Sequence, residues 1–151
     1  LPKETVVHVW KDVTNVTEVL AGGYDVLRNV GYDKTSWYLD NLDVTWKQVY
    51  ANEPCHDVPD ALCPKILGGH GEMWGETVDA SDFDSTVWPR LAAIGERLWS
   101  SVDDVDAARP RLEAFRCLLL ERGVGAAPLN NSMARTAPVG PGACTQRRRR
   151  I

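Results

Sequence analysis

The feature that most constrains the fold is an alternation of apolar runs, suited to buried strands, with amphipathic runs suited to helices. The strand-like runs are rich in β-branched and aromatic residues and cover residues 5–10, 33–40 and 65–75. Helical periodicity appears over 14–31 (interrupted at Gly22-Gly23), 43–52, 84–100 and 104–123. Strands that alternate with helices pair in parallel, so the pattern predicts an α/β fold.

Three parallel strands alone would leave apolar sheet edges bare. We therefore expect residues 1–129 to be the C-terminal portion of a (β/α)₈ TIM barrel, with about three βα units and a C-terminal helix. A small doubly wound sheet is the alternative, but the sequence has no phosphate-binding glycine loop to support it. Residues 130–151, rich in Pro, Gly and Arg, are expected to form a loose tail.

The overall composition is that of a globular protein, with 44% hydrophobic residues, 25% charged residues and a net charge of -4 over 151 residues. No apolar run is long enough to span a bilayer. A nucleic-acid binder using the Arg147–Arg150 run is disfavoured by the negative net charge and by the lack of aromatic residues near the tail. The opening "LPKETVVHVW" shows no secretory signal and reads as the interior of a fold, which predicts a fragment or a processed product.

The four cysteines fall as two local pairs, Cys55 with Cys63 and Cys117 with Cys144. Neither pair has the close spacing of a zinc site, so we predict two disulfides, no metal site and no cofactor. Two Asn-x-Ser/Thr sequons, at Asn15 and Asn130, predict glycosylation. Disulfides and sequons together favour a secreted, lysosomal or vacuolar protein.

The ends of the three expected strands carry the residues that suggest a binding site. They supply Trp10 from the first, Tyr38 and Asp40 from the second, and Trp74 and Glu76 from the third. In a barrel the carboxyl ends of the strands meet on one face, and residues two apart on a strand point the same way. Indole rings stack on the apolar face of a pyranose, while carboxylates accept hydrogen bonds from its hydroxyls. The sequence therefore predicts a sugar pocket.

Five motifs in this order resemble the family 20 glycosidases, specifically the C-terminal part of a β-N-acetylhexosaminidase catalytic domain. They are "VVHVW", "WYLD", "GEMWGE", "WPRLAAIGERLWS" and "LEAFRCLLLERGVGAAPL", and they cover most of residues 5–129. The resemblance implies an exo-acting glycoside hydrolase that removes terminal β-linked GlcNAc or GalNAc from glycans and glycoconjugates. It also implies homodimers of the complete enzyme.

The resemblance assigns a role to each residue at the strand ends. Trp10 and Trp74 would form walls of the pocket, and Tyr38 would hydrogen-bond the acetamido carbonyl of the substrate. Glu76 would bind hydroxyls of the sugar ring, chiefly at C4 and C6, and Asp40 would lie near the C6 hydroxyl. Family members use substrate-assisted retention, in which the acetamido oxygen attacks the anomeric carbon.

The Asp-Glu pair that this chemistry requires lies on an earlier strand in the family, in a "GGDE"-like stretch that is absent from these 151 residues. We therefore expect the isolated chain to be inactive and the complete protein to be the enzyme. A non-catalytic carbohydrate-binding module that uses the same aromatic pocket is the alternative. His70 and Glu72 also differ from the Glu and Cys that are more usual in this motif.

Overall fold

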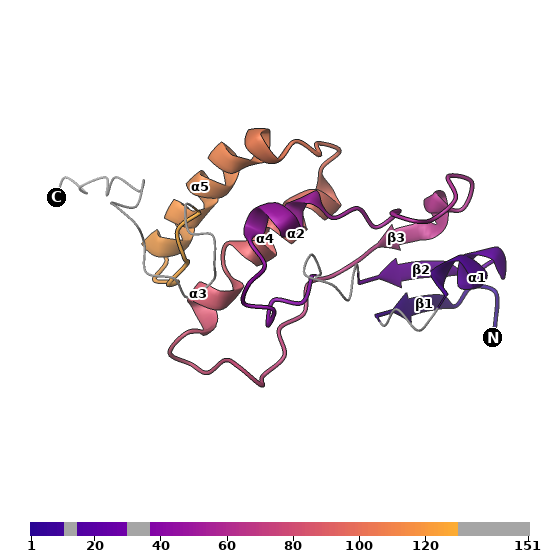
Figure 1. The fold of residues 1–151 in the computed structure, drawn as a ribbon, viewed down its shortest axis with the longest axis horizontal. Helices are drawn as coiled ribbons and strands as arrows, with labels where there is room; N and C mark the ends of the chain where they lie inside the picture. The colour runs from indigo at the N-terminus through magenta and orange to yellow at the C-terminus, as the bar shows by residue number, and fades with distance from the viewer. Residues whose placement is uncertain (11–14, 30–36, 130–151) are drawn as a thin grey trace.

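The computed structural model describes residues 1–10, 15–29 and 37–129. In these residues three strands form one parallel sheet in the order β1 (Val6–Val9), β2 (Asp25–Arg28) and β3 (Ile66–Gly68). Val7 pairs with Val26, which pairs on its other side with Ile66. Figure 1 shows the three strands side by side and pointing the same way, with most of the helices beyond their carboxyl ends. The predicted α/β class with parallel strands is confirmed.

The second strand is not where the sequence analysis placed it. Helix α1 (Val16–Ala21) ends before Gly22-Gly23, and the residues predicted to continue it form β2 instead. Gly23 has a φ of +91°, a backbone conformation that a helix does not accommodate. Beyond it Val26 is buried while its neighbour Leu27 is exposed, which is the alternation of a strand.

The strand expected over residues 33–40 is likewise revised. Residues 33–36 lie outside the described residues, and residues 37–40 make one isolated parallel bridge, between Tyr38 and Glu72, before the chain turns. The third strand is also shorter than expected, since the pairing ends at Gly68, whose φ is +148°. Glycine tolerates this conformation where other residues are strained.

The remaining helices follow the predicted order with different boundaries. Thr45 and Gln48 cap α2 through a reciprocal capping box. The helix expected over 84–100 is two helices separated at Trp88 and Pro89, because proline lacks the N–H that would continue the first. Gly123, with a φ of +83°, lies two residues after the end of the last helix. The bounds are α2 (Trp46–Ala51), the 3₁₀ helix η1 (Cys63–Lys65), α3 (Phe83–Val87), α4 (Arg90–Trp99) and α5 (Val105–Glu121).

Two groups of buried side chains hold these elements together. The smaller one packs α1 onto the sheet and comprises Val9, Leu20, Val26 and Val58. The larger one lies among the helices and includes Trp37, Leu39, Val44, Trp46, Val49, Tyr50, Ile94 and Leu112. Trp37 is fully buried, and its indole N–H donates to the Val49 carbonyl at 2.9 Å. The residue before Tyr38 is therefore an anchor that fixes this segment against α2.

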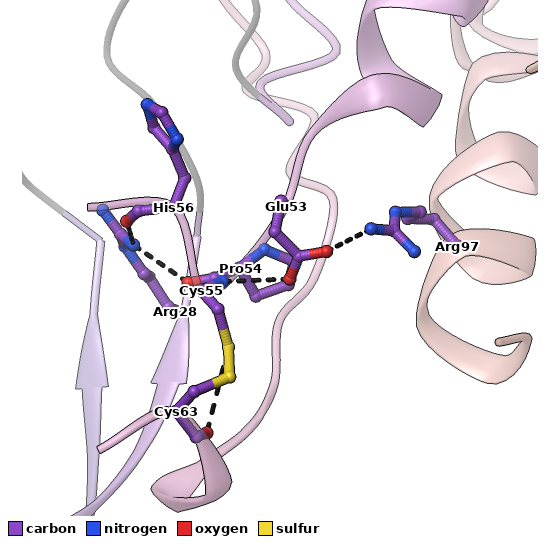
Figure 2. Close-up of a disulfide and its surroundings, with 7 residues drawn as sticks. All are labelled: Arg28, Glu53, Pro54, Cys55, His56, Cys63 and Arg97. Carbon is purple, nitrogen blue, oxygen red and sulfur yellow. Dashed lines mark hydrogen bonds and ion pairs between the residues drawn. A yellow bond between two sulfur atoms is a disulfide. The ribbon is translucent and has the colours of Figure 1, made fainter. Parts of the chain in front are cut away.

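Figure 2 shows the loop that leads from α2 to η1 and its disulfide between Cys55 and Cys63, as predicted. The Arg28 guanidinium, at the end of β2, donates to the carbonyls of Pro54 and His56 at 2.9 and 2.7 Å. Glu53 forms an ion pair with Arg97 of α4. The loop is thus tied to both the sheet and the helices.

Several predictions concern residues that the structure does not describe. Cys144, Asn130 and the tail from residue 130 lie outside the described residues, so the second disulfide, the second sequon and the loose tail stay predictions. Among the helices of the described residues, none has the length and hydropathy of a membrane span.

Candidate functional site

Two tryptophans from different strands lie together at the carboxyl end of the sheet. Trp10 directly follows β1, and Trp74 lies six residues beyond the end of β3. The centroids of the two rings are 6.0 Å apart and their planes meet at 38°. Both side chains are partly open, with 40% and 44% of their surface exposed. Two indoles held close together and partly exposed offer a flat apolar surface to a ligand.

A third aromatic residue of the site, Tyr38, comes from the segment that lies between the two tryptophans in sequence. Its phenol O–H donates to the backbone carbonyl of Trp10. Its backbone is fixed by the bridge to Glu72, in which the Leu39 N–H donates to the Glu72 carbonyl at 2.6 Å. In return the Glu72 N–H donates to the Trp37 carbonyl at 3.0 Å. The phenol is therefore set beside Trp10 by two backbone hydrogen bonds.

Glu72 contacts Trp74 and His70 on the other side of this aromatic cluster, a role that the sequence analysis did not assign to it. One carboxylate oxygen accepts from the indole N–H of Trp74 at 3.0 Å, and the other lies 2.5 Å from Nε2 of His70. Partial burial alone raises the pKa of the Glu72 carboxyl, but interactions led by the hydrogen bond to His70 outweigh it and lower the pKa. Glu72 is thus held as a carboxylate that orients the Trp74 ring.

Asp40 lies near a buried cation on the far side of Tyr38. The Arg90 guanidinium, at the start of α4, donates to the carbonyls of Leu39 and Asn41, the latter at 2.7 Å, and to Thr86 at 2.7 Å. Burial lowers the pKa of Arg90 to about 10, and the charge of Asp40 opposes that shift. Arg90 therefore remains charged at neutral pH and fixes the turn that presents Tyr38 and Asp40.

The structure brings together three of the five predicted site residues, Trp10, Tyr38 and Trp74. Asp40 is half-buried, and Glu76 sits in an exposed turn two residues after Trp74. The sequence analysis left out His8, whose ring lies 4.5 Å from that of His70. His8 lies on β1 and its side chain is exposed. The sequence held one signal for His8, because it lies two positions before Trp10 and residues two apart on a strand point the same way.

Comparison with known proteins bears directly on this arrangement. The model of the "Glycosyl hydrolase family 20, catalytic domain" matches residues 1–102, about two thirds of the chain. The chain belongs to glycosyl hydrolase family 20. All of the residues of the candidate site, from His8 to Glu76, fall within the matched part.

Curated relatives of this family 20 chain include plant and animal proteins. Beta-hexosaminidase 1 of Arabidopsis thaliana is 43% identical over 95% of this chain and 27% of its own length. Beta-hexosaminidase subunit beta of Homo sapiens is 40% identical over 83% of this chain and 23% of its own length. The chain therefore spans about a quarter of the length of these relatives.

Solved structures give the same picture for the fold. The chitobiase of Flavobacterium johnsoniae is similar over 87% of this family 20 chain and 21% of its own, with 33% identity and a TM-score of 0.65. An exo β-N-acetylglucosaminidase from Vibrio harveyi, solved with N-acetylglucosamine, gives a TM-score of 0.70 at 24% identity, over 87% of this chain and 23% of its own. The second likeness bears on the fold alone.

Proposed function

We propose that this chain is part of an exo-acting β-N-acetylhexosaminidase and forms one wall of its sugar pocket. Residues 1–129 would complete the C-terminal side of a (β/α)₈ catalytic barrel. The observation that carries the proposal is the meeting of Trp10, Tyr38 and Trp74 at the carboxyl end of a parallel sheet. In barrels this end is where ligands bind. Membership of family 20 and the beta-hexosaminidase relatives support the same activity.

Each residue of the wall has a task that its chemistry suits. Trp10 and Trp74 would stack against the apolar face of the terminal sugar. Tyr38 would turn its phenol O–H from the Trp10 carbonyl to the acetamido carbonyl of the substrate. Asp40 and Glu76 would accept hydrogen bonds from sugar hydroxyls, as ionised carboxylates do strongly.

The catalytic step that we propose is substrate-assisted. The acetamido oxygen of the substrate attacks the anomeric carbon and forms an oxazolinium, while a glutamic acid protonates the leaving oxygen. A donor that holds the acetamido oxygen near the anomeric carbon raises the rate through proximity. We place the Asp-Glu pair outside these 151 residues, which contain no Asp-Glu dipeptide.

The proposal is tested with a chromogenic β-GlcNAc glycoside. We expect the complete enzyme to hydrolyse it and the 151-residue chain alone not to. In the complete enzyme Trp74→Ala should raise KM roughly tenfold, because one stacking wall is lost. Trp99→Ala is the matched control, since Trp99 is 92% exposed at the end of α4 and should leave KM unchanged.

Two results would contradict the proposal. One is a complete enzyme that binds the sugar without turnover, which is the behaviour of a carbohydrate-binding module. The other is turnover by the purified 151-residue chain that Glu76→Gln abolishes, since the acid would then lie within this chain.

The secretory or lysosomal route that we propose makes Asn15 a glycosylation site. Asn15 is exposed and caps α1, where its Oδ1 accepts from the N–H groups of Thr17 and Glu18 at 3.1 and 3.3 Å. Expressed in a eukaryotic secretory host, Asn15→Gln and Asn15→Asp should each remove one glycan, seen as a mobility shift. Asn15→Gln should also lower the free energy of unfolding by about 1 kcal/mol, because the cap is lost. Asn15→Asp keeps the cap, so its free energy of unfolding should stay at the wild-type value. Equal mobility of Asn15→Gln and wild type would rule out this glycan.

A further inference from the structure

We propose that His8, His70 and Glu72 bind a Zn²⁺ ion directly beneath the aromatic wall of the pocket. Each offers one ligand atom, and these three atoms all lie within 4.8 Å of one another. Neither the Cys spacing nor any local motif indicated a metal, because the three residues come from two segments more than sixty positions apart. The sheet brings them together.

The backbone fixes the approach of the three side chains. His8 lies on β1, and β1 pairs with β2, which pairs in turn with β3. His70 and Glu72 follow β3, and Glu72 is held in place by its bridge to Tyr38. The two imidazole rings meet edge to face, with centroids 4.5 Å apart. His70 Nε2 and a Glu72 oxygen are already 2.5 Å apart, so two of the three ligand atoms point at one spot.

The donor set selects the class of ion. Two imidazoles and one carboxylate are ligands for Zn²⁺, with a fourth position left to water, whereas Mg²⁺ and Ca²⁺ take oxygen ligands. Zinc bonds of about 2.0–2.2 Å keep neighbouring ligand atoms about 3.3 Å apart. Rotation of side chains that are exposed or half-buried supplies a shift of this size, and the ion replaces the direct contact between His70 and Glu72.

A second feature at the same place favours a polar ligand. Asn29, the first residue after β2, lies beside Glu72 and is 5% exposed. Its side-chain oxygen and nitrogen are both buried, and the amide lies close enough to hydrogen-bond the Glu72 carboxylate. An amide that holds a ligating carboxylate fixes its orientation toward a metal.

We expect zinc at this site to weaken sugar binding. This expectation rests on the proposed function. Glu72 bonds to the indole N–H of Trp74 at the same time as it faces His70. An ion that draws the carboxylate toward the two histidines pulls it away from Trp74. We therefore expect saturating Zn²⁺ to raise the KM of the complete enzyme about fivefold, the factor expected for the loss of one hydrogen bond.

Calorimetric titration of the complete enzyme with ZnCl₂ tests the site without any assay of activity. We expect a Zn²⁺ site that His8→Gln and His70→Gln each weaken at least about tenfold. His56→Gln is the matched control, because His56 is an exposed loop histidine paired with Asp57 and should leave binding unchanged. Substitution by Co²⁺ should give visible absorption bands that both site variants lose, and MgCl₂ should give no binding signal at this site.

The outcomes separate the metal site from the enzymatic function. No Zn²⁺ binding up to millimolar concentration, or wild-type affinity in folded His8→Gln and His70→Gln variants, overturns the site even if the enzyme is active. Zn²⁺ binding lost in both variants supports the site even if no sugar is hydrolysed. If both hold, relief of Zn²⁺ inhibition by His70→Gln supports the link through Glu72, and inhibition of equal strength in that variant contradicts it.

Discussion

Tyr38→Phe is expected to lower kcat of the complete enzyme by about 10²–10³-fold, as for the loss of one donor that acts in the transition state. The phenol O–H donates to the backbone carbonyl of Trp10, one of the two tryptophans that we assign to the sugar. The acetamido oxygen that must attack the anomeric carbon needs a fixed donor on its carbonyl. Phenylalanine keeps the ring and removes only that donor. kcat and kcat/KM should therefore fall together.

Tyr24→Phe provides the control for the same chemical change. The Tyr24 hydroxyl donates to the Leu1 carbonyl at 3.1 Å, just before β2 begins. This substitution should leave both kinetic constants within a factor of about two, since no transition-state donor is removed. A Tyr38→Phe enzyme whose kcat stays within a factor of about two of wild type would refute the role assigned to Tyr38.

Gly69→Ala is expected to lower the free energy of unfolding by about 3 kcal/mol, at the upper end of the usual cost of overpacking. A Cβ at this position would overlap the backbone oxygen of Arg28 and lie 2.5 Å from Cζ3 of Trp37. Neither neighbour moves easily, because one is the backbone at the end of β2 and the other is a fully buried ring. The strain would reach the site through Trp37, which precedes Tyr38.

Gly95→Ala makes the same substitution where space is available. Gly95 lies inside α4, and a Cβ there meets nothing within 4 Å. Alanine should raise the free energy of unfolding by about 0.5–1 kcal/mol, since it loses less backbone entropy in a helix. Both variants are compared by urea unfolding of the complete enzyme. Equal midpoints for Gly69→Ala and wild type would show that β2 and Trp37 are not packed against Gly69 as described.

Local signals in the sequence predicted some parts of the structure well. The strand-like runs at β1 and β3 each depend on residues that are neighbours in sequence, although only Val9 of β1 is buried. The disulfide between Cys55 and Cys63 was also predictable, because a short spacing brings the two cysteines together. The position of Trp10 at the end of β1 followed from the same run, whereas Trp74 lies six residues beyond the end of β3.

Other parts were not available to local reasoning. Asp25–Arg28 belong to a run whose apolar positions suit a helix, yet pairing between β1 and β3 makes a strand of them. Trp99 lies in a run with helical periodicity at the end of α4, yet it is 92% exposed in the described residues. Trp46 is 3% exposed, and its indole N–H donates to the carbonyl of Leu129, 83 residues away.

The sequence alone determined the alternation of strands and helices, the likeness to family 20 and the residue types at the strand ends, because each is written in contiguous residues. The tertiary structure decided which of those residues meet. It set Glu72 between His70 and Trp74, and it brought His8 to His70. The contact of His8 with His70 joins segments far apart in the chain, as does the bridge from Tyr38 that holds Glu72. They are fixed by the register of the sheet and the packing around Trp37, and no local pattern encodes either of these.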